Sequence, residues 1–294
     1  MFPQGFYVLT PIIDEEQTIL EKTEAALGAG RPLIGGDQYR AVTAELRTVA
    51  TDMNRACLLA TAWQGLAGIA FAAEIQVYTN VVNQMALLHS AAAQCVDAQA
   101  VAVLQARKGL EHLAFRLVVC QIEARNAALA GNMAAVLEIQ EAAVDEVEPQ
   151  RKGVVAVLAN STAVHAARMN AFSATLTRLA ETLGGSTLDS AAGSAVTIEP
   201  AKLTLLASSL SNCSAAMIGL VYGAPWIVSE LRLTHGDSLT RGFNAAVAIF
   251  EQTRDEVLTL AHEKVDARAA DLSDAAGMYA ECDESSGSEC EEEF

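Results

Sequence analysis

The sequence predicts an all-α protein built from long antiparallel helical hairpins, which form elongated bundles in two helical units. Hydrophobic residues make up 52% of the chain but aromatic residues only 5%. Alanine supplies much of that apolar content, and alanine-rich sequence favours long helices that approach closely. Proline is absent between Pro32 and Pro149, which permits long uninterrupted elements. Apolar residues recur at spacings of three and four, and no segment alternates convincingly with period two.

The first unit is expected over residues 39–183, after an N-terminal segment of residues 1–38 that holds one short helix. A helix starts at Tyr39 and ends near Trp63-Gln64-Gly65, and a second helix continues toward Leu104. Glycine and proline then predict breaks between three further helical stretches, at residues 110–130, 133–146 and 154–183.

A small, polar linker over residues 184–197 separates the second unit, which spans residues 198–283. It reads as a helix opening at Glu199-Pro200, a glycine-rich bend carrying Trp226, and a long helix from Leu239 to Tyr279. The apolar stripe of that last helix is longer than its neighbour can cover, so we expect a partner chain to cover the rest. Residues 284–294 are strongly acidic and are expected to form a disordered tail.

The formal net charge of −17 argues against binding to nucleic acid and to anionic lipid surfaces. The N-terminus lacks the basic residues of a cleavable signal peptide, so none is expected. The most apolar windows are short or interrupted by polar residues, so no transmembrane span is expected and membrane association is left open.

Catalytic and metal-binding patterns are not found. Four cysteines fall on apolar stripes, where a free thiol behaves as a small hydrophobic group, whereas Cys282 and Cys290 lie in the acidic end and could oxidise outside the cell. No C-x-x-C pair, zinc-binding pair, nucleophile motif or dinucleotide loop occurs. We therefore expect no metal, no cofactor and no enzymatic activity.

Several short motifs of the second unit occur in a characteristic order: Thr197-Ile198-Glu199-Pro200, Leu206-Ala207-Ser208, Thr234-His235-Gly236 and Ala275-Ala276-x-x-Tyr279-x-x-x-Asp283. This order resembles the EspC-like substrates of ESX (type VII) secretion. The resemblance implies that Tyr279 and Asp283, four residues apart beyond a helical hairpin, form the export signal. The alternative is a tyrosine that packs in the core and is followed by a solvated acidic tail.

Trp63-Gln64-Gly65 at the predicted helix–helix turn is similar to the hairpin tip of the WXG, PPE and EspA-like secretion substrates. Glycine allows the backbone to reverse direction, while the indole of Trp63 can cover the open end of the hairpin. Trp226 is a possible second tip, but it is followed by Ile227-Val228 and no glycine, a departure from the pattern.

These resemblances imply a secreted ESX substrate without enzymatic activity, which is made in the cytoplasm and acts by binding or assembly at or outside the cell envelope. The implied partners are the type VII secretion machinery and either further copies of the chain or a helical co-secreted protein. A cytoplasmic helical scaffold or chaperone for a secreted partner is the competing class. A lipid-active envelope protein is the third, disfavoured by the net negative charge.

Overall fold

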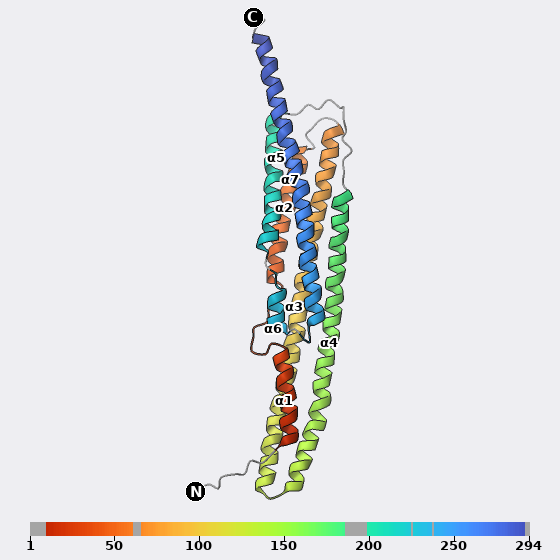
Figure 1. The fold of residues 1–294 in the computed structure, drawn as a ribbon, viewed down its shortest axis with the longest axis vertical. Coiled ribbons are helices and arrows are strands. Elements are labelled where there is room, and N and C mark those ends of the chain that lie inside the picture. Colours follow the sequence, from red (N-terminus) through yellow and green to blue (C-terminus); the bar gives the residue numbers. More distant parts are fainter. Residues whose placement is uncertain (1–9, 61–65, 186–198, 225, 237, 292–294) are drawn as a thin grey trace, which may run out of the picture. The chain divides into compact units, whose positions relative to one another are not determined.

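The computed structural model describes residues 10–60, 66–185, 199–224, 226–236 and 238–291. Within these residues the chain forms seven helices and no strand, which confirms the all-α class (Figure 1). The helices are α1 (Pro11–Ala26), α2 (Asp37–Ala60), α3 (Leu66–Leu129), α4 (Met133–Gly185), α5 (Pro200–Gly223), α6 (Val228–His235) and α7 (Arg241–Glu291).

The residues group into two compact units that are interleaved along the sequence. Unit 1 comprises residues 1–35, 95–169 and 227–247, and unit 2 comprises residues 36–94, 170–226 and 248–294. Helices α3, α4 and α7 therefore each contribute residues to both units. The expected arrangement was sequential, with a linker at residues 184–197. Most of that linker lies outside the described residues, so its role stays a prediction.

Unit 1 is built on an antiparallel hairpin between the second half of α3 and the first half of α4. Gln99 donates to Thr162, and Arg116 pairs with Glu146. Later residues of α3 thus contact earlier residues of α4, so the two helices are antiparallel. Gly131, with φ +75°, allows the tight turn between the helices. Helix α1 adds Ile13 and Leu20 to the hairpin's apolar core, and its C-cap residue Leu27 joins them.

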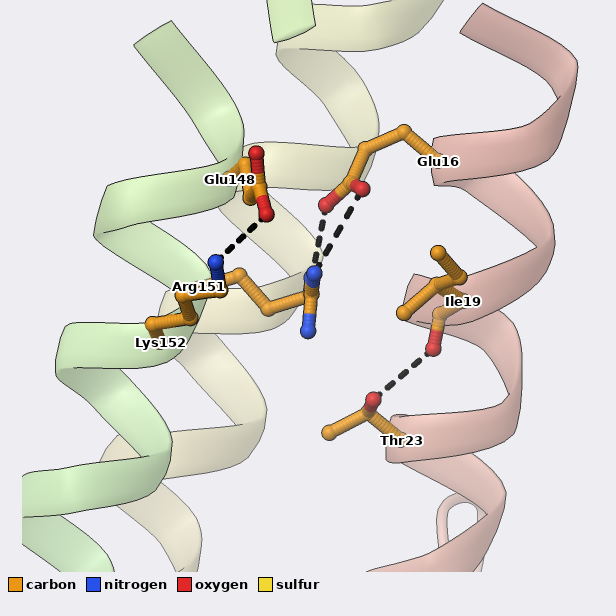
Figure 2. A network of polar contacts seen from close by, with 6 residues as sticks. All are labelled: Glu16, Ile19, Thr23, Glu148, Arg151 and Lys152. Carbon is orange, nitrogen blue, oxygen red and sulfur yellow. Dashed lines mark hydrogen bonds and ion pairs between the residues drawn. The ribbon is translucent and has the colours of Figure 1, made fainter. Parts of the chain in front are cut away.

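An ion pair joins α1 to α4 inside unit 1. Figure 2 shows the guanidinium of Arg151 reaching the carboxylate of Glu16, with Nε 2.6 Å from Oε1. These side chains are only 14% and 5% exposed, so each charge is largely removed from water and depends on the other. The neighbouring pair of Lys152 and Glu148 is solvent-exposed on one helix and contributes little.

Arg107 of α3 ties the end of α1 to the end of α6. Its guanidinium donates to the carbonyl oxygens of Leu27, Gly28, Arg31 and Thr234. The last carbonyls of a helix have no partner within the helix, so one planar cation satisfies several of these acceptors at once.

Unit 2 contains a second antiparallel hairpin, formed by α2 and the first half of α3. Cys57 Sγ lies 3.4 Å from the carbonyl oxygen of Ala72, and at the other end Gly36 approaches the backbone of Ala93 closely. As residue numbers rise from Gly36 to Cys57, those of the residues they contact fall from Ala93 to Ala72, as expected for antiparallel helices. Helix α5 packs along α2. An ion pair between Arg268 of α7 and the buried Glu74 of α3, at 3.0 Å, crosses the same unit.

Two helices are longer than expected. Helix α3 continues through residues 104–110 and contains Gly109, where an added Cβ would stand 3.0 Å from Val154 of α4 in unit 1. Helix α4 continues through Pro149. Proline removes one backbone donor and disturbs the preceding turn, but burial of Val147 and Leu158 on either side holds the helix together.

The end of the chain also differs from expectation. Helix α7 runs to Glu291 rather than ending near Tyr279, so the expected disordered tail is helical for most of its length. No proline follows Pro225, so nothing in the sequence stops the helix sharply. In place of a simple bend between residues 219 and 239, the chain forms the short helix α6.

The stripe of α7 does not need a partner chain, and that inference from its length was wrong. Its members from Phe243 to Ala276 are at most 8% exposed in the described structure. The expectation counted only the preceding helix as a cover, whereas α2 and α3 also contact α7 in unit 2, through Tyr39 and Glu74.

Candidate functional site

Along α7 up to residue 281, where the side chains are described, the last buried ones are Leu272 and Ala276, and residues 277–281 are all exposed. Tyr279 is 39% exposed and its neighbour Met278 is 63% exposed. The helix therefore leaves the core of unit 2 immediately before the tyrosine. The phenol ring is accessible to another molecule without any rearrangement of the packed helices.

Asp283 lies on the same helix, four residues after Tyr279. Residues four apart in a helix lie on one face about one turn apart, so the two positions share a face of α7. Both positions lie two turns or more before the end of α7.

The predicted hairpin tip, Trp63 and Gly65, lies outside the described residues. The flanking structure is described: α2 ends at Ala60, α3 begins at Leu66, and the two pair antiparallel.

Trp226 lies where the chain leaves α5, and it is fastened to α7. Its indole Nε1 donates to Asp255 Oδ2 at 2.9 Å, while the other carboxylate oxygen of Asp255 accepts from Nε of the fully buried Arg254 at 2.7 Å. The ring is 49% exposed. A shallow groove beside it is lined mainly by polar side chains of α7: Gln252, Asp255, Glu256, Thr259 and Glu263. Trp226 therefore packs against the side of α7. Because α6 follows α5 before α7 begins, Trp226 does not lie at a direct turn between two long helices.

A serine, a histidine and an aspartate meet between α5 and α7 in unit 2. Ser214 Oγ lies 2.6 Å from His262 Nδ1 and 3.3 Å from Asp266 Oδ1. In a nucleophilic triad the carboxylate orients the imidazole, whereas here it contacts the serine. Ser214 is also fully buried. The arrangement is that of a polar contact between packed helices. The described residues contain no cluster of three or more potential metal ligands.

Unit 2 also contains a buried polar cluster that was not predicted from the sequence. Tyr39 of α2 donates to Glu251 Oε1 of α7 at 3.0 Å, and its ring packs edge-on against Phe250 with centroids 5.6 Å apart. His89 of α3 packs against the same phenylalanine, and burial lowers the pKa of its imidazole to about 4. Glu251 interrupts an apolar stripe directly after Phe250, which was the available signal.

Residues 27–112 match the EspA/EspE family. The matched region begins just after α1, contains all of α2 and covers nearly the first three quarters of α3, so it includes the paired parts of α2 and α3. It is less than a third of the chain. No curated protein and no solved structure is similar enough to this chain to match it.

Two helical regions in the described part of the chain are long and apolar enough to cross a membrane, residues 68–129 and 200–235. In both, 39% of the most apolar window is buried within the structure. Core helices of bundles satisfy the same criteria, so length and composition do not separate the two environments here.

Proposed function

We propose that this protein is a substrate of an ESX (type VII) secretion system that acts, without catalysis, by binding or assembly at or outside the cell envelope. The observation that carries the proposal is the EspA/EspE family match over residues 27–112. It falls on the antiparallel pair of helices α2 and α3. The sequence Trp63-Gln64-Gly65 between them supports the proposal through its resemblance to the hairpin tip of WXG, PPE and EspA-like substrates. Its partners are then the secretion machinery and either a second copy or a helical co-secreted protein.

Tyr279 and Asp283 are proposed as the export signal. The exposure of residues 277–281 supports this role, because a receptor can reach Tyr279 while the helix stays folded. The phenol can enter an apolar slot, and a carboxylate one turn away can meet a basic group or a helix N-terminus of the machinery. The resemblance of residues 198–283 to EspC-like substrates is a separate part of this proposal, and the family match does not extend to these residues.

The test compares export with folding in single variants. Tyr279→Ala and Asp283→Ala should each abolish appearance in the culture filtrate, while the melting temperature stays within a few degrees of wild type because the tyrosine is outside the core. Asp283→Glu should be exported. Met278→Ala is the matched control, since it removes a more exposed apolar side chain about 100° around the helix from Tyr279.

Normal export of both alanine variants would show that the signal is misassigned. Retention of the wild-type chain in cells that export other ESX substrates would favour the cytoplasmic scaffold or chaperone instead. Loss of folding in Tyr279→Ala would instead indicate that Tyr279 packs in the core, which is the alternative to an export signal.

A further inference from the structure

The outward face of α3 in unit 1 carries an apolar strip. Its large side chains are spaced by three, four or seven residues, with one longer step, and their exposed fractions run from 40% at Val118 to 81% at Leu129. We call this the α3 strip: Val101, Leu104, Phe115, Val118, Ile122 and Leu129. The opposite face of the same segment is buried, with Val103, Leu110 and Leu117 in the core of unit 1. Burial on one side thus leaves a second apolar face in water.

Four exposed charged residues accompany the strip. Lys108 and Arg125 are cationic, and Glu111 and Glu123 are anionic, so this set is neutral in a chain whose formal net charge is −17. Two copies of so acidic a chain repel over most of their surface. They can meet at the α3 strip without local repulsion, because each cation of one copy finds an anion of the other within reach of its long side chain.

The size of the strip matches a modest interface. Residues 101 and 129 are separated by 28 residues of helix, or about 42 Å at 1.5 Å per residue. Six partly exposed side chains of this size offer roughly 500 Å² per copy, about 1,000 Å² in a pair, which is near the lower limit for a specific protein interface.

We infer that the α3 strip is the surface on which a second copy of this chain docks, α3 against α3. A lipid bilayer is a poorer match, because the four charges lie among the apolar side chains and would have to enter hydrocarbon with them. The inference deepens the assembly role in the proposed function and rests on it for its setting. Association is measured on purified protein and export in cells, so either proposal can fail alone.

The first experiment measures association of the full chain by sedimentation velocity over a wide concentration range. Wild type should form a dimer with a dissociation constant in the micromolar range, roughly 1–100 µM. Phe115→Asp, at the middle of the strip, should weaken dimerisation at least tenfold. Leu87→Asp is the matched control: it lies on the same helix, in unit 2, is 63% exposed and should leave the dimer intact. A wild-type chain that stays monomeric throughout overturns the inference.

Charge reversal tests the strip without touching its apolar side chains. Lys108→Glu with Arg125→Glu leaves four acids along the strip and should weaken the dimer at least tenfold. Adding Glu111→Lys and Glu123→Lys restores neutrality and should restore the dimer, whether the helices pair parallel or antiparallel. Circular dichroism checks that both variants fold. If the double variant dimerises as strongly as wild type, or if the quadruple variant does not regain dimerisation, α3–α3 docking is contradicted.

Cysteine cross-linking locates the contact and its direction. Phe115→Cys should form a disulfide-linked dimer under mild oxidation, beyond any background from the native cysteines, and Leu87→Cys should not. Leu129→Cys should then cross-link either with itself, in a parallel pair, or with Leu104→Cys, in an antiparallel pair. Cross-linking through Leu87→Cys but not Phe115→Cys would place the interface elsewhere. A monomer that instead floats with phosphatidylcholine and phosphatidylglycerol vesicles would assign the strip to a membrane.

Discussion

His89 in unit 2 and His235 in unit 1 are both fully buried, and burial lowers the pKa of each imidazole to about 4 from its usual value near 6.5. His89 Nδ1 contacts the carbonyl oxygen of Met85 at 2.8 Å, and His235 Nε2 contacts that of Ile34 at 3.1 Å. These contacts favour the protonated ring but do not offset its loss of hydration. Both histidines are therefore neutral in the folded protein at neutral pH.

This predicts a loss of stability in mild acid. Between about pH 6.5 and pH 4 the unfolded chain binds protons that the folded chain excludes, so the stability present above pH 6.5 declines as pH falls through this window. Each histidine contributes about 2 kcal/mol to the loss between about pH 7.5 and pH 5. Urea unfolding at both pH values measures it.

The variant His89→Asn should reduce that pH-dependent loss by about 2 kcal/mol, whatever it does to stability at neutral pH. His112→Asn changes an exposed histidine of α3 and serves as the control. Equal pH dependence in His89→Asn and wild type would mean that His89 titrates normally in the folded chain.

At the scale of elements, the junction between α6 and α7 depends on one glycine. Gly236 ends α6 with φ +83°, and an added Cβ would stand 1.8 Å from the carbonyl oxygen of Ala26 in α1. Gly131, between α3 and α4, has a similar φ of +75° but no atom within 4 Å of its added Cβ. The two glycines therefore share a positive φ and differ in the space around them.

Gly236→Ala should destabilise the protein by about 3 kcal/mol or more, because positive φ and a backbone clash act together. Gly131→Ala should cost only about 1 kcal/mol, from the backbone conformation alone. Chemical denaturation of both variants beside wild type measures the difference. Equal costs would show that the approach of α1 to Gly236 is relaxed in solution.

At the scale of the whole molecule, the interleaved units make the two halves of the chain interdependent. Unit 1 needs residues 227–247, whose Thr234 and His235 bond to Arg107 and Ile34. Unit 2 needs α5 and α7 as well as α2, since α2 packs along α5. Neither half of the sequence contains a complete unit.

A cut within residues 186–198 should therefore produce two fragments that do not fold cooperatively alone but regain cooperative thermal unfolding when co-expressed. Circular dichroism with limited proteolysis measures this, and a wild-type chain nicked after folding is the control, expected to stay associated. An N-terminal fragment that melts cooperatively at the wild-type temperature would instead support sequential domains.

Much of the helical architecture follows from sequence because it depends on neighbours in the chain. The alanine-rich composition, the apolar spacing and the long proline-free stretch predicted helices where α2, α3, α5 and α7 occur. Helix ends were harder to predict. The sequence predicted gaps between Leu104 and Leu110 and around Pro149, yet α3 and α4 are continuous through both.

The sequence by itself determined the helical class, the acidic surface and the two motifs that suggest secretion, all of which are local or compositional properties. Only the tertiary structure decided which apolar faces are covered. An amphipathic stripe shows that a face avoids water, but its cover comes from segments far away in sequence. The α7 stripe is therefore buried within the chain, while the α3 strip, in a helix that is apolar on more than one face, lies in water.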